Sequence, residues 1–369
     1  MSIKKSKIKV AIFPLFGLES LVATFLDKNR FEIARFKLVK DQTIDKYGQE
    51  LFGDWCYSLK LFVSVFEKLV REQNVKKVVG IKINLCKYPM VMGDLQKWIK
   101  KDFEYYQISM DELCVSKETM LDFFKQIKKI DPELKFIEFT KKIPAAIKRL
   151  GLGKKLTQTY YKTLPLVKNP ASLKRTFDEY KRKFILAEGA QESENIVNEF
   201  SKICSKEKIK EKPKYRFLIA GDATTILLGF PFFDLDVFLA KHGAETVLSW
   251  PSSIYNFKLS KYSKQAKEKL HKIMSNKNSP AKITDKYIVE LITLSEILKG
   301  LDQKVDGIIY VKPNMCTPLD NISYVIKKEN FFGLPFVELS YDEHSGINGM
   351  LTRLEAFINI VSDKKDTSK

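Results

Sequence analysis

The sequence predicts an α/β protein of two Rossmann-like parallel-sheet domains joined by a helical bridging segment. In each half of the chain, short runs rich in valine and isoleucine alternate with segments whose apolar residues recur every three or four positions. This alternation is typical of parallel sheets covered by helices. Between the halves, the spacing is helical and strand patterns are lacking. We therefore expect an N-terminal domain over residues 1–140, a helical bridge over 141–212 and a C-terminal domain over 213–369.

Individual elements follow from the periodicity of apolar residues. In the N-terminal domain, strands are expected at 8–13, 31–39 and 75–83, with helices at 18–26 and 59–70. In the C-terminal domain, strands are expected at 215–220, 245–250, 306–311 and 335–340, with helices at 232–241, 285–301, 321–328 and 350–361. A charged, proline-containing stretch over 206–214 places the boundary near residue 213.

Composition narrows the classes of protein. Hydrophobic residues make up 44% and aromatic residues 12% of the chain, enough for well-filled cores. No run of about 18 apolar residues is present and the first residues lead straight into a strand pattern, so we expect a cytoplasmic protein with reduced thiols and no membrane span. The net charge is +19, but the lysines are spread along the chain, so we do not expect nucleic-acid binding. Nucleic-acid binding remains the third and weakest alternative, and phosphates of a CoA thioester would also suit a basic cleft.

Three of the five cysteines lie where α/β folds build functional sites. Cys56 directly precedes a predicted helix, whose free N–H groups would stabilise a thiolate. Cys86 and Cys316 follow the ends of predicted strands, on the crevice side of an open sheet. Cysteine is also a common small buried residue, and no CxxC pair is present, so spacing alone leaves a metal site and a core role open. Cys204 and Cys114 fit the core role.

The C-terminal region carries a more specific signal. Five segments follow one another: Val-Asp-Gly-Ile-Ile at 305–309, Pro-Asn-Met-Cys-Thr-Pro at 313–318, Gly-Leu-Pro-Phe at 333–336, Asp-Glu-His-Ser-Gly at 342–346 and Leu-Thr-Arg-Leu-Glu-Ala-Phe at 351–357. In this order they resemble the end of the 2-hydroxyacyl-CoA dehydratase family, and more narrowly its 2-hydroxyglutaryl-CoA dehydratase-like and CoA protein activase-type members. The earlier Ile-Phe-Pro at 12–14, Cys-Tyr-Ser at 56–58, Cys-Lys-Tyr at 86–88 and Ile-Ala-Gly-Asp at 219–222 are similar to that family more loosely. Ser58 stands where the family usually has proline, and Lys87 where arginine is common.

The resemblance implies an iron–sulfur protein. By position, Cys56, Cys86 and Cys316 would hold a [4Fe-4S] cluster, with a double-cubane [8Fe-9S] cluster as the alternative. The chain would accept low-potential electrons from an ATP-dependent activator protein, for reductive or radical chemistry on an acyl-CoA substrate. Three thiolates would leave one iron open to water, substrate or a bridging sulfide. The family also implies a second cluster-bearing subunit or a homodimer. The alternatives are a double-cubane-type reductase of small molecules and a non-catalytic scaffold or assembly subunit without metal.

Other residues near the predicted crevice allow two interpretations. Glu343 and His344 are candidate catalytic residues, but Asp342 could equally cap a turn there. Arg353 could bind a phosphate or carboxylate, or pair with an acidic side chain such as Glu338. Neither a GxGxxG nor a P-loop motif is present, so we expect ATP to bind to the activator and not to this chain.

Overall fold

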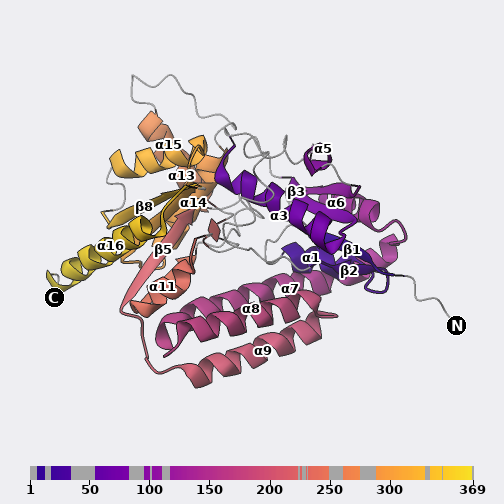
Figure 1. Cartoon of the computed structure of the whole chain (residues 1–369), viewed down its shortest axis with the longest axis horizontal. Helices are drawn as coiled ribbons and strands as arrows, with labels where there is room; N and C mark the ends of the chain where they lie inside the picture. Colours follow the sequence, from indigo (N-terminus) through magenta and orange to yellow (C-terminus); the bar gives the residue numbers. More distant parts are fainter. Residues whose placement is uncertain are drawn as a thin grey trace. The chain divides into compact units, whose positions relative to one another are not determined.

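The computed structural model confirms the predicted fold class: an α/β protein with two four-stranded, all-parallel sheets and a helical region between them in the chain (Figure 1). It describes residues 6–12, 18–34, 55–82, 95–99, 102–109, 117–222, 225–226, 230, 232–248, 261–274, 288–328, 333–342 and 344–367. The chain forms two compact units. The first unit comprises Met1–Glu50 and Leu61–Lys212, and the second comprises Leu51–Lys60 and Pro213–Lys369.

The sheet of the first unit has the strand order β2-β1-β3-β4. Its strands are β1 (Ile8–Ile12), β2 (Phe31–Ile33), β3 (Lys77–Lys82) and β4 (Glu104–Ser109). The helices that connect them are α1 (Leu18–Phe25), α3 (Tyr57–Gln73) and α5 (Leu95–Ile99), and α6 (Lys117–Ile130) follows β4. The central strands are fully buried at Val10 and Val78, as expected for a parallel sheet covered by helices.

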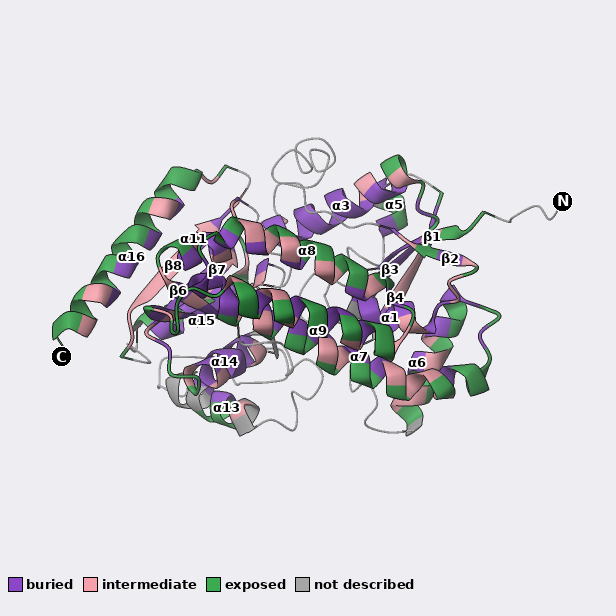
Figure 2. Ribbon diagram, turned by 90° about the horizontal axis from the view of Figure 1, so that it is seen from below, coloured by how far each residue is buried: buried purple, intermediate pink, exposed green. Residues whose placement is uncertain are grey.

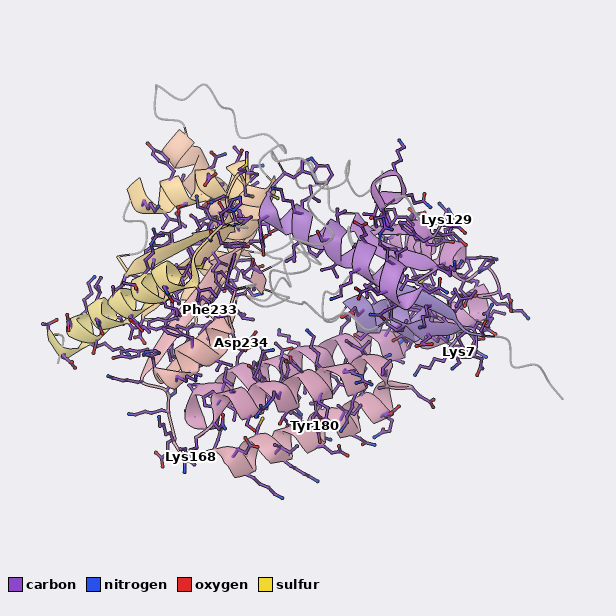
Figure 3. All side chains as sticks on the ribbon, viewed as in Figure 1. Lys7, Lys129, Lys168, Tyr180, Phe233 and Asp234 are labelled. Atoms are coloured by element: carbon purple, nitrogen blue, oxygen red, sulfur yellow. The ribbon has the colours of Figure 1, made fainter. Side chains whose placement is uncertain are left out.

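Three long helices complete the first unit: α7 (Phe136–Thr163), α8 (Pro170–Leu186) and α9 (Ala190–Glu207), with a short 3-10 turn at Leu164–Leu166. They lie side by side, and each alternates between buried and exposed stripes (Figure 2). The rings of Tyr160 and Phe177 stack with 4.0 Å between centroids, and the ring of Tyr180, a residue labelled in Figure 3, lies 5.5 Å from that of Phe200. The helical region thus has its own aromatic core.

The sheet of the second unit has the order β6-β5-β7-β8. Its strands are β5 (Tyr215–Gly221), β6 (Ala244–Leu248), β7 (Gly307–Pro313) and β8 (Phe336–Tyr341). Its helices are α11 (Leu235–Lys241), α13 (Lys261–Met274), α14 (Ile288–Leu301), α15 (Thr317–Lys328) and α16 (Ile347–Thr367). The buried residues Leu218 and Ile308 share one cluster with α13, α14 and α15. On the opposite face, Phe217 packs against Phe357 of α16 with 5.0 Å between ring centroids.

Several elements differ from the sequence expectation. Strand β4 was not predicted, because its short run mixes tyrosines with polar residues and resembles a surface segment. Helix α13 lies in a lysine-rich region for which no element was predicted. Helix α15 begins at Thr317 and not at residue 321, because proline is well tolerated in the first turn of a helix and Pro318 stands there. In the part of the chain that the structure describes, no helix is long and apolar enough to cross a membrane.

Candidate functional site

The strand order of the second unit defines where a site would form. The chain passes from β5 to β6 on one side and from β7 to β8 on the other, so the order reverses between β5 and β7. In open α/β sheets, ligands bind outside the carboxyl ends of the strands at such a reversal. Asp222 follows β5, Asn314 to Cys316 follow β7 and Asp342 follows β8. The candidate site lies at this edge of the sheet.

Cys316 begins helix α15 at this edge. Its carbonyl oxygen accepts a hydrogen bond of 2.9 Å from the Asp320 N–H, which places Cys316 at the N-cap position. The side chain is partly buried and packs against the apolar cluster of the sheet. Preceding it, Met315 has a φ of 66°, and the Asn314 N–H donates to the Tyr341 carbonyl at 2.7 Å. The turn after β7 is therefore bonded to β8, and Cys316 has a defined place.

Cys56 lies in the same unit as Cys316, although it comes from the first half of the sequence. Its carbonyl oxygen accepts hydrogen bonds from the N–H groups of Leu59 (3.0 Å) and Lys60 (3.2 Å), so Cys56 is the N-cap of α3. Its side chain is partly exposed. Both cysteines thus begin helices, as predicted for Cys56, and both stand beside the free N–H groups of a helix N-terminus.

An aromatic cluster surrounds the residue after Cys56. Tyr57 is 2% exposed, and its ring lies 5.7 Å from Phe232 and 5.6 Å from Tyr341, measured between centroids. Phe230 and Phe233, just before α11, extend this cluster, with 5.1 Å between their ring centroids. The start of α3 is therefore packed against side chains of the second unit.

Asp222 accepts four hydrogen bonds at a single oxygen. Its Oδ2 receives the Ser58 hydroxyl at 2.9 Å, the Thr225 N–H at 2.8 Å, the Thr225 hydroxyl at 2.8 Å and the Tyr341 hydroxyl at 3.0 Å. Tyr341 is fully buried, and burial together with the charge of Asp222 raises the pKa of its phenol well above the usual value. Tyr341 therefore remains protonated and acts as a donor.

Asp342 caps the turn after β8. Its Oδ1 accepts the His344 N–H at 2.9 Å and the Ser345 hydroxyl at 2.8 Å, and its Oδ2 accepts from the Asn314 side chain at 2.6 Å. Burial alone would raise the pKa of this carboxyl, but these hydrogen bonds outweigh it and lower the pKa. His344 is exposed, and Glu343 lies outside the described residues. A catalytic role for Glu343 and His344 stays a prediction.

An ion-pair network joins α15 to strands β7 and β8. Glu338 of β8 binds Lys327 at 2.7 Å and Lys312 at 3.3 Å, and Lys312 also pairs with Asp320. Burial would raise the pKa of Glu338, but hydrogen bonds from Lys327 and two serines, with the charge of Lys312, lower it to about 2. Arg353 is exposed on α16, so Glu338 takes these two lysines, and not Arg353, as its ionic partners.

Of the three remaining cysteines, the structure describes only Cys204. Cys204 is 2% exposed on α9, which confirms the core role predicted for it, and burial raises the pKa of its thiol to about 11. Cys86, the third predicted ligand, and Cys114 lie outside the described residues. Within the described ranges, no group of three or more His, Cys, Asp or Glu side chains could hold a metal ion. The described part of the predicted ligand set is therefore Cys56 and Cys316.

Comparison with known proteins adds no assignment: no family model matches the chain, and no curated protein matches it. Among the residues of this edge, Tyr341 was missed by sequence reasoning. It ends an apolar strand, where a tyrosine looks like one more core residue. One signal in the sequence pointed to such a donor. Asp222 directly follows a predicted strand and a glycine, so its carboxylate was expected at the carboxyl edge, where it needs hydrogen-bond donors.

Proposed function

We propose that this chain is an iron–sulfur protein that accepts low-potential electrons, with Cys56, Cys86 and Cys316 as the cluster ligands. The observation that carries the proposal is the position of Cys56 and Cys316. They are 260 residues apart in sequence, yet both belong to the second unit and both begin a helix. The third ligand, Cys86, rests on the sequence resemblance.

The chemistry of the two described thiols fits such a cluster. Iron–sulfur clusters are held by thiolates, and helix N-termini stabilise thiolates. Both side chains are partly exposed, so iron and sulfide could reach them. Cys204 gives the opposite case, because it is buried on α9 and burial keeps its thiol protonated. The described cysteines therefore separate into two that suit metal binding and one that does not.

A bound cluster would supply low-potential electron transfer. The chain's own residues would hold the thiols in place and give them partly apolar surroundings. Cys316 packs against the apolar cluster of the second sheet, and the neighbour of Cys56, Tyr57, packs against Phe232 and Tyr341. Apolar surroundings and nearby N–H groups are the means by which proteins set a cluster's potential.

The substrate and partner follow from the resemblance in the C-terminal segments. We propose an acyl-CoA thioester as substrate, with dehydration or reduction of a 2-hydroxyacyl group as the reaction. An ATP-dependent activator would deliver the electrons. The net charge of +19 is compatible with a phosphate-bearing ligand such as CoA.

The proposal is tested by purifying the full chain under strict anaerobiosis and measuring iron, acid-labile sulfide and the visible spectrum. We expect about four iron atoms per chain for one cubane, with a visible band that bleaches on reduction. Iron well above this amount, with matching sulfide, would indicate the double-cubane form. A colourless protein that stays free of iron after reconstitution with iron and sulfide would contradict the proposal and favour the scaffold alternative.

A further inference from the structure

We propose that Asp222 and Ser58 form a latch that positions Cys56 at the carboxyl edge of the second sheet. The role of Cys56 as a cluster ligand rests on the proposed function. The latch itself concerns the folded chain and can be tested without a bound cluster. It would act through Cys56 and not on a reacting atom, so Asp222 and Ser58 are positioning residues.

The latched segment at the start of α3 comes from the first half of the sequence. Residues 51–60 belong to the second unit, whereas the rest of α3 belongs to the first. Ser58 and Asp222, joined at 2.9 Å, are 164 positions apart in sequence. The hydrogen bond between Ser58 and Asp222 is therefore a long-range tertiary contact.

Two of the described contacts at the start of α3 differ in how tightly they define its position. Tyr57 supplies ring contacts with Phe232 and Tyr341, and Ser58 supplies the hydrogen bond to Asp222. Ring packing is broad and tolerates rotation and sliding, whereas a hydrogen bond to one carboxylate oxygen sets both distance and direction. The Ser58 hydroxyl therefore supplies a contact that sets both the distance and the direction of the helix start relative to Asp222.

The acceptor is held rigidly. Asp222 follows Gly221, whose φ of 116° turns the backbone. The Asp222 N–H donates to the Val311 carbonyl at 2.8 Å. The Thr225 N–H and hydroxyl and the Tyr341 hydroxyl all bind the same oxygen that Ser58 uses. With donors from the segment after β5 and from β8, the carboxylate has little freedom to rotate.

The latch also stands close to the thiol along the chain. Cys56 is two residues before Ser58, and the Leu59 and Lys60 N–H groups donate to its carbonyl. Helix ends fray unless side chains hold them. Without the Ser58 hydrogen bond, the first turn of α3 would open more often, and Cys56 would lose its fixed place.

Hydrogen exchange on the full-length, iron-free chain tests the latch directly. Ser58→Ala removes the hydroxyl and leaves β5 and β8 intact, and Asp222→Asn removes the charge at the acceptor. Hydrogen bonds to charged groups are strong enough that we expect roughly tenfold or faster exchange at the amides of residues 57–60 in Ser58→Ala. Peptides from β7 and α14 should exchange as in the unmodified chain.

Two matched variants control for removing any serine or aspartate from this unit. Ser340→Ala and Asp320→Asn alter residues that bind Glu338 and Lys312 and that lie outside the latch. Exchange at residues 57–60 should stay unchanged in both. Unchanged exchange in Ser58→Ala would overturn the latch. If Asp222→Asn unfolds the second unit, the exchange measured in Ser58→Ala still tests the latch.

Anaerobic reconstitution then separates this inference from the proposed function. If the unmodified chain takes up no iron, the proposed function fails, while the exchange result stands on its own. If it takes up iron, Ser58→Ala should retain less of it after desalting than Ser340→Ala. Equal retention, despite faster exchange at residues 57–60, would show that the latch does not serve the thiol.

Discussion

The two sheets share one strand order but differ in what stands at their carboxyl ends. In each, the first strand of the unit lies inside the sheet and the order reverses between the first and third strands. Cys86 and Cys316 follow that third strand at nearly the same spacing, four residues after Lys82 and three after Pro313. Only the second unit also carries a segment from elsewhere in the chain, residues 51–60. Equal topology therefore does not make the two units equivalent.

Two carboxyl groups, one buried and one partly buried, also differ between the units. In the first unit, Glu19 is 5% exposed in the first turn of α1, and burial raises its pKa to about 7. In the second unit, Glu338 has two lysines and two serines as partners, and its pKa is lowered to about 2. Burial without donors favours the neutral acid, whereas burial with donors favours the ion. Glu19 and Glu338 therefore differ in the partners that surround them.

The largest expected effect comes from glycines of the two units. Gly221 has a φ of 116°, and a Cβ there would collide with the Val311 carbonyl. We expect Gly221→Ala to destabilise the second unit by about 3 kcal/mol or more. The matched variant is Gly151→Ala on α7, where a Cβ meets nothing within 4 Å, and it should stabilise the protein by about 0.5–1 kcal/mol. Thermal unfolding of both variants checks this, and equal shifts would contradict it.

A buried arginine tests the first unit in the same way. Arg149 is 1% exposed and donates to the Thr24 hydroxyl at 2.7 Å and to the Phe184 carbonyl at 2.8 Å, at the end of α8. Arg149→Ala leaves these groups without their partner, and we expect a loss of about 3 kcal/mol by denaturant unfolding. Arg175→Ala, on the exposed side of α8, should change stability by no more than about 0.5 kcal/mol. A similar loss in both variants would refute the role given to Arg149.

The pH dependence of Glu19 is the next effect. Its pKa is raised from an ordinary 4.5 to about 7, so its stabilising contribution is full below pH 4.5 and is lost as pH rises through 7. As the pH rises from 4.5 to 8, the unmodified chain should lose up to about 3 kcal/mol of unfolding free energy that the Glu19→Gln variant keeps. Unfolding curves at both pH values measure this, and parallel pH profiles of the two proteins would contradict it.

Glu338 should show the opposite sign. Its pKa is lowered from 4.5 to about 2, so its contribution is full above pH 4.5 and disappears as pH falls through 2. Because Lys327 is 53% exposed, solvent weakens the pairing, and we expect Glu338→Gln to cost about 2 kcal/mol at pH 7. The difference between variant and unmodified chain should shrink toward pH 3. A constant difference across this range would show that packing, and not charge, is responsible.

Sequence reasoning reached the fold class, and it placed Cys56 before a helix and Cys316 after a strand, for clear physical reasons. Apolar periodicity indicates which segments are strands and helices, and strand ends carry Asp222 and Cys316 to one edge. The assignment of residues 51–60 to the second unit could not be predicted, because periodicity within a segment says nothing of which distant sheet it meets. The hydrogen-bond donors to Asp222 could not be predicted for the same reason. Ser58 looked like a departure from a family pattern, and Tyr341 looked like a core residue.

The most direct test of the account compares iron content across five single variants purified and reconstituted without oxygen. Cys56→Ala, Cys86→Ala and Cys316→Ala should each lose most of the bound iron, because each removes a proposed ligand. Cys204→Ala and Cys114→Ala should retain as much iron as the unmodified chain, because neither removes one. Equal iron in all five variants would contradict the proposed ligand set.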